Sequence, residues 1–234
     1  MHLELPININ GVELKDYQKF MKIAEANPDV ENNFLDIKLL EIVCKLDYNT
    51  ISKMPITIFD EILGELAKVF SEKTPLVNRF NMTDKNGEVV EFGLVPNLDK
   101  LSLGEYIDLN TYFDDLDEMH KAMAVLYRPI HPSFRGKPHY RIAEYQGTEE
   151  FSEIMKEMPL GIALGAKVFF YRLGMKLAKL TVSYSQKILM KEAVHSEEVA
   201  TLLKDMDGIS NSILSQEVKR SEYLRQLNYR FTKQ

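Results

Sequence analysis

The side chains with the most chemical potential in this 234-residue chain lie in the acidic run from Asp114 to His120, which reads DDLDEMH. Carboxylates and imidazoles are common metal ligands in proteins. A zinc-binding helix needs two histidines one turn apart, however, and this run contains a single histidine. The stretch from Asp84 to Glu91 likewise fails the calcium-loop pattern. We therefore predict no bound metal and interpret the run as a solvated first helical turn.

A second candidate group is basic and follows Pro129 in one loop: His131, Arg135, Lys137, His139 and Arg141. Arginine forks suit phosphates and carboxylates, so this cluster could hold a phosphate or a partner's carboxylate. The alternative is a solvated loop, with pairing to the chain's own acidic helix as one option. Ser133 lies among these residues, but neither a Gly-x-Ser-x-Gly elbow nor an oxyanion-hole glycine pattern accompanies it.

Cofactor and nucleophile signals are missing elsewhere too. The glycines match neither the Gly-Lys-Ser/Thr phosphate loop nor the Gly-x-Gly-x-x-Gly fingerprint, so we predict no cofactor. Cys44, the single cysteine, lies in the apolar stretch LLEIVCKL and is interpreted as a small core residue. Gly161 and Gly165 are spaced for close helix packing. We expect no catalytic residues and a non-enzymatic function.

Two structural or interaction sites are expected instead. Arg128 ends a predicted helix among apolar neighbours, so its head group needs a buried or half-buried acceptor. We expect a carboxylate such as Asp108 or Glu105, or carbonyls of the preceding turns, to provide it. The second site is a narrow apolar stripe on a mostly charged C-terminal helix, suited to packing against a partner, a second copy or the chain's own body. Its members are Leu214, Val218, Leu224, Leu227 and Phe231.

The elements that position these residues follow from hydrophobic periodicity and turn residues. In residues 1–74 the pattern predicts an edge strand over 3–9 and amphipathic helices over 14–26, 34–46 and 56–71. In residues 75–175 it predicts a hairpin of 76–82 and 88–95 around Asn86-Gly87, a helix over 111–127, a strand over 139–145 and a helix over 149–156. A long apolar helix opens at Pro159, and a last helix covers 209–231, so residues 176–234 form a helical arm.

We therefore expect a mostly α, α+β fold with a helical N-terminal part (1–74), a central hairpin-containing part (75–175) and long C-terminal helices (176–234). The net charge of −6 argues against direct binding of nucleic acid or anionic lipid. No apolar window reaches the length of a membrane span. The arm differs from the rest, with ten basic and seven acidic side chains.

Several sequence segments resemble those of the tail assembly chaperones and small tail-region structural proteins of tailed bacteriophages. These segments are VELKDYQKF, FGLVPNLDKLSLGEYIDL, HKAMAVLYRPI, YRIAEYQGT and MPLGIALGAKVFFYRLG. The resemblance covers about residues 12–175. It implies a role in virion assembly, in the cytoplasm of an infected bacterium, with helical tape-measure segments or other tail and neck proteins as partners. The alternatives are a permanent structural protein of the virion's neck, tail or internal cargo, and a small soluble enzyme.

Overall fold

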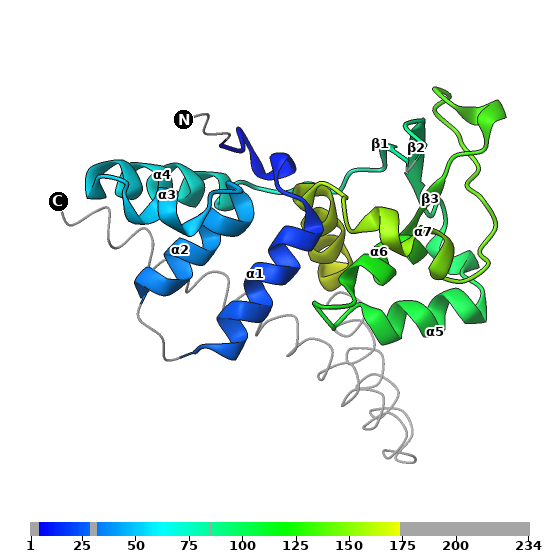
Figure 1. Cartoon of the computed structure of the whole chain (residues 1–234). Helices are drawn as coiled ribbons and strands as arrows, with labels where there is room; N and C mark the ends of the chain where they lie inside the picture. The colour runs from blue at the N-terminus through cyan, green and yellow to red at the C-terminus, as the bar shows by residue number, and fades with distance from the viewer. Residues whose placement is uncertain (1–4, 29–31, 85, 174–234) are drawn as a thin grey trace, which may run out of the picture.

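The structure is a computed structural model that describes residues 5–28, 32–84 and 86–173. The mostly α, α+β fold class is confirmed. In Figure 1, helices α1 to α4 lie on one side of the helix formed by residues 160–173, and the small sheet lies on the other side with α5 to α7. The predicted long C-terminal helices over 176–234 lie outside the described residues.

The chain does not begin as the predicted strand, at least over residues 5–9. Instead, a short 3-10 turn, η1 (Ile9–Gly11), forms because the side chain of Asn8 accepts a hydrogen bond from the Asn10 amide. Pro6 lacks the amide hydrogen that a strand ladder needs, which works against the predicted pairing. α1 (Leu14–Ala26) then follows at its predicted position.

The three helices after α1 complete the N-terminal part. α2 (Asn32–Val43) and α4 (Ile56–Phe70) occupy the regions where helices were predicted. α3 (Tyr48–Ser52) was not predicted; it begins at Asp47, whose carboxylate accepts from the Thr50 amide. Such a cap stabilises the free amides of a first turn and makes a very short helix possible.

The sheet has three antiparallel strands, β1 (Arg79–Thr83), β2 (Val89–Leu94) and β3 (Tyr127–Pro129), in the order β1-β2-β3. The predicted hairpin is present, with Gly87 at a φ of 82° in its turn. β3 was not predicted, because a three-residue strand has too little periodicity to recognise. Phe92 pairs with both Phe80 and Pro129, which places it at the centre of the sheet.

The single helix predicted over 111–127 is wrong. Two helices, α5 (Leu103–Tyr112) and α6 (Met119–Leu126), flank a non-helical connection. Asp115 lies in that connection and accepts a hydrogen bond from the Asp117 amide, so its side chain competes with helical backbone bonding. The acidic residues thus end one helix and precede the next.

The predicted strand over 139–145 is also wrong, because only an isolated bridge between Ile130 and Ile142 forms there. α7 (Glu149–Met155) and the helix over 160–173 lie where helices were predicted. One hydrophobic core joins the helices to the sheet, and seven of the eight residues of α6 are buried. α5 packs against this buried α6 and presents its other side to solvent.

Candidate functional site

The buried ion pair between Arg128 and Glu105 holds α5 to the sheet. Arg128 lies on β3 and Glu105 in the first turn of α5, and the residues are only 5% and 6% exposed. The guanidinium Nη2 of Arg128 donates to Oε1 of Glu105. Of the two carboxylates expected for Arg128, the structure therefore brings Glu105 to it.

Asp108, the other expected carboxylate, has a different partner. It accepts a hydrogen bond from the hydroxyl of Tyr145. The Tyr145 ring in turn lies 5.6 Å from the Arg128 guanidinium carbon, in a cation–π contact. Burial, followed by the hydrogen bond to Asp108, raises the pKa of Tyr145. Asp108 thus contacts Arg128 only indirectly, by holding the Tyr145 ring that packs against the guanidinium.

Glu105 also completes a capping box at the start of α5. Its Oε2 accepts from the Ser102 amide at 2.6 Å, and the Ser102 hydroxyl accepts from the Glu105 amide at 3.2 Å. Burial alone would raise the pKa of Glu105, but the bonds with Ser102 and the charge of Arg128 outweigh it, and the pKa is lowered. The carboxylate is therefore held ionised. The Ser-x-x-Glu spacing was a readable signal for this cap that the sequence analysis missed.

The outer side of α5 carries three large apolar side chains that are exposed to solvent. Leu103, Tyr106 and Ile107 are 75%, 61% and 51% exposed. Their spacing of three and four residues places them on one side of the helix, where they form a continuous apolar surface. We call these three residues the α5 ridge. The sequence analysis missed the ridge, because it did not recognise this segment as a helix.

The basic residues predicted as a cluster form a second surface, in the loop of residues 131–141, which we call the cationic loop. Its five basic side chains are exposed. The ring of Phe134 lies beneath two of them, 5.6 Å from Lys137 Nζ and 5.8 Å from the Arg141 guanidinium carbon. The loop does not pair with the acidic run: Asp117 binds Lys22, and Glu118 binds Lys121. The interpretation of a solvated loop agrees with the exposure of its basic side chains, whereas the suggested pairing with the acidic run is wrong.

The remaining side chains that could act as a base or a nucleophile, His120 and Cys44, are buried in the protein interior. His120 is buried rather than solvated, and its Nδ1 lies 3.3 Å from Nε2 of Gln18, which also donates to the Leu116 carbonyl. Burial lowers the pKa of His120. Cys44 is buried just after α2, and burial raises the pKa of its thiol to about 11. A thiol with so high a pKa is a poor nucleophile at neutral pH.

Within the described ranges, no group of three His, Cys, Asp or Glu side chains is arranged to hold a metal ion. The same part of the chain contains no helix long and apolar enough to cross a membrane. The predicted partner-binding residues Leu214, Val218, Leu224, Leu227 and Phe231 lie outside the described residues. No protein family, curated protein or solved structure gives a significant match to the chain.

Proposed function

We propose that this protein is a non-enzymatic virion-assembly factor of a tailed phage, a tail assembly chaperone that binds helical segments of a tape-measure-like protein. The α5 ridge is the observation that carries the binding activity. The phage setting rests on the resemblance of residues 12–175 to the tail assembly chaperones. Other tail or neck proteins, and a second copy of the chain, belong to the same class of partner.

The geometry of the α5 ridge suits a helical partner. Side chains three and four residues apart on one helix form a row that fits the groove between rows on another helix. Large exposed apolar groups gathered in one place are typical of protein-binding surfaces, because water leaves them on binding. Leu103, Tyr106 and Ile107 meet both conditions.

The way α5 is held supports the same activity. Ser102 and Glu105 cap its first turn, and Arg128 fixes Glu105 from the sheet side. A binding helix that is already rigid loses little conformational entropy when a partner docks. The buried side of α5 therefore prepares the exposed side for binding.

The surroundings of the reactive groups favour binding over catalysis. Glu105 is engaged by Arg128, His120 by Gln18, and the Cys44 thiol is buried. A general base or nucleophile needs access to a substrate, and these three groups face the protein interior.

The test is whether the α5 ridge keeps a tape-measure protein soluble. The tape-measure protein of the same phage is co-expressed with the wild type or with a triple variant, Leu103→Ser, Tyr106→Ser and Ile107→Ser. We expect the wild type to hold it in the supernatant and the triple variant to leave it in the pellet. An unchanged soluble fraction with the triple variant would contradict the proposal.

A matched control removes three other large apolar side chains at exposed positions. Tyr48→Ser, Ile56→Ser and Ile58→Ser lie on α3 and α4, and all three parent side chains are exposed. This control should behave as the wild type. Mass spectrometry of purified virions separates the alternatives, because a chaperone is absent from them, whereas a structural neck, tail or cargo protein is present in a fixed ratio.

A further inference from the structure

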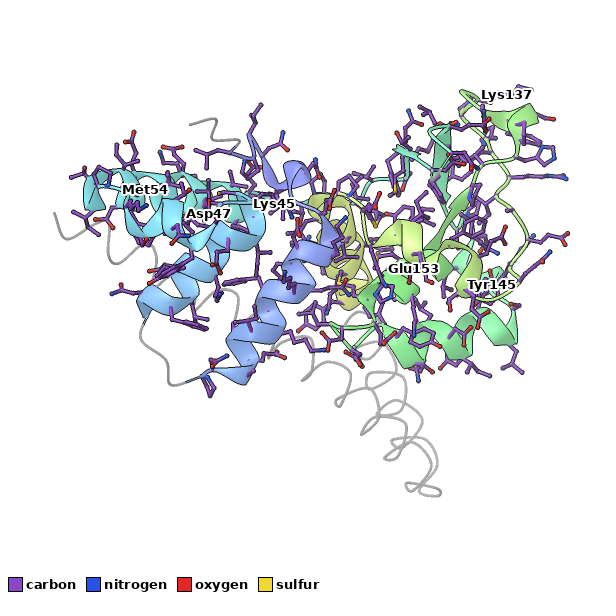
Figure 2. The ribbon with its side chains drawn as sticks, in the orientation of Figure 1. Lys45, Asp47, Met54, Lys137, Tyr145 and Glu153 are labelled. Atoms are coloured by element: carbon purple, nitrogen blue, oxygen red, sulfur yellow. The ribbon has the colours of Figure 1, made fainter. Side chains whose placement is uncertain are left out.

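We propose that the cationic loop is a docking surface for an acidic segment of a partner protein, separate from the α5 ridge. Figure 2 shows Lys137 at the tip of this loop, on the far side of the small sheet from α5. The two surfaces therefore lie at opposite ends of this part of the molecule. A partner at one surface leaves the other accessible.

The charge of the cationic loop is unbalanced. Residues 130–141 contain no Asp or Glu, although the whole chain has a net charge of −6. In the described part of the chain, no carboxylate forms an ion pair with Arg135, Lys137 or Arg141. Concentrated, unneutralised charge attracts an oppositely charged surface and orients it during the encounter.

Arg79 of β1 also holds the loop in place. Its Nε donates to Glu91 of β2 at 3.0 Å, while its Nη1 and Nη2 donate to the carbonyls of Lys137 and Phe134. The Arg79 guanidinium carbon lies 5.0 Å from the ring of Tyr140. Arg79 thus connects both halves of the loop to the β1-β2 hairpin. These contacts hold the backbone that carries the exposed cations.

Two further contacts fix the ends of the loop. The Tyr140 hydroxyl donates to the Leu94 carbonyl at 2.8 Å, and the His131 amide donates to the Arg141 carbonyl at 2.8 Å. Because these contacts order the backbone before a ligand binds, the loop loses less conformational entropy on binding than a flexible loop would. This is what distinguishes the loop from scattered surface lysines.

An acidic protein segment fits the loop better than nucleic acid does. Single-stranded nucleic acid is bound by stacking its bases on free aromatic rings. The loop's phenylalanine and tyrosine rings are covered by cations: Lys137 and Arg141 lie over Phe134, and Arg79 lies over Tyr140. A long polyanion would also be repelled by the acidic remainder of the chain. Aspartate and glutamate side chains accept the paired hydrogen bonds that arginine donates.

The experiment measures binding of a fluorescein-labelled peptide, composed of Asp, Glu, Gly and Ser, to the full-length protein by fluorescence anisotropy. We expect the triple variant Arg135→Gln, Lys137→Gln and Arg141→Gln to raise the Kd about tenfold, because three exposed charge pairs together contribute roughly that factor. Binding of the wild type should weaken as salt is added, because salt screens exposed charges.

The matched control is Lys19→Gln, Lys53→Gln and Lys73→Gln, which changes the net charge equally at exposed positions elsewhere. It should bind the peptide as the wild type does. An equal loss in both variants would show general charge attraction and overturn the proposal, as would the absence of peptide binding by the wild type. Tighter binding of a single-stranded oligonucleotide than of the peptide, lost in the cationic-loop variant, would assign the loop to nucleic acid instead.

Discussion

At the scale of single residues, Arg128 and Glu105 form a buried charge pair that is incompletely satisfied. Arg128 donates to Glu105 and lies against the Tyr145 ring, but its Nε has no hydrogen-bond partner in the described structure. Removing charges from water costs free energy that the mutual attraction must offset. The loss of either partner would leave the other buried and unpaired.

We therefore expect Arg128→Ala to lower the free energy of unfolding by about 3–5 kcal/mol. A protein of ordinary stability would then be close to unfolding at physiological temperature. Urea denaturation followed by circular dichroism measures the change. Arg135→Ala, which removes an exposed arginine, serves as the control and should change stability by less than about 0.5 kcal/mol. A melting temperature for Arg128→Ala equal to that of the parent would rule out the structural role.

The same pair has a pH signature that a mere packing role would not produce. The folded pKa of Glu105 is lowered, so its ionised form stabilises the protein above the ordinary glutamate pKa of about 4.3. This contribution is lost as the pH falls through that value towards the folded pKa. The stability difference between wild type and Glu105→Gln should therefore be largest at neutral pH and shrink below about pH 4.

At the scale of elements, two helical glycines have opposite surroundings. Gly165 lies on the helix over 160–173, where an added Cβ would sit 2.2 Å from the Pro75 carbonyl oxygen. The close packing expected for this helix is thus realised against the segment that leads into β1. Gly104 lies on α5, where the nearest atom to an added Cβ is in the Tyr145 ring at 3.8 Å, an ordinary contact distance.

We expect Gly165→Ala to destabilise the protein by about 1–3 kcal/mol, because the backbone must shift to admit the methyl group. Gly104→Ala should be neutral or stabilise it by up to about 1 kcal/mol, because alanine favours a helix over glycine. Thermal unfolding of the two variants beside the wild type provides the comparison. The same direction of change in both would contradict this description of the two helices.

At the scale of the whole molecule, the described residues form a folded body with two proposed binding surfaces. The helix over 209–234 remains a prediction from the sequence. The body shares one hydrophobic core from Ile9 to Ala166. A helix of mostly polar residues has little stability alone in water, so the apolar stripe from Leu214 to Phe231 needs a surface to pack on.

Deleting residues 209–234 should therefore leave the body with its cooperative melting transition, because the described residues share a continuous hydrophobic core of their own. It should also abolish self-association or partner binding through the stripe. Calorimetry measures the first outcome, and sedimentation velocity measures the second. Loss of the cooperative transition would mean that the segment is an ordinary core helix.

Local patterns in the sequence were sufficient for the fold class and for most of the helices. α1 and α4 follow from apolar side chains at helical spacing, and the β1-β2 hairpin follows from Asn86-Gly87. α5 and α3 start at local caps, Ser102 and Asp47, that were readable but missed. The division of the region 111–127 depended on competition between aspartate side chains and the helical backbone, which hydrophobic periodicity does not report.

The sequence by itself indicated that Arg128 needs a buried or half-buried acceptor, because apolar residues surround a charge that cannot be neutralised. Only the tertiary structure decided that this acceptor is Glu105 rather than Asp108, since the choice depends on which turn of α5 meets β3. The cationic loop was likewise visible as a row of basic residues. Its support by Arg79, more than 50 residues earlier in the chain, arises from the pairing of β1 with β2 and has no local sequence signal.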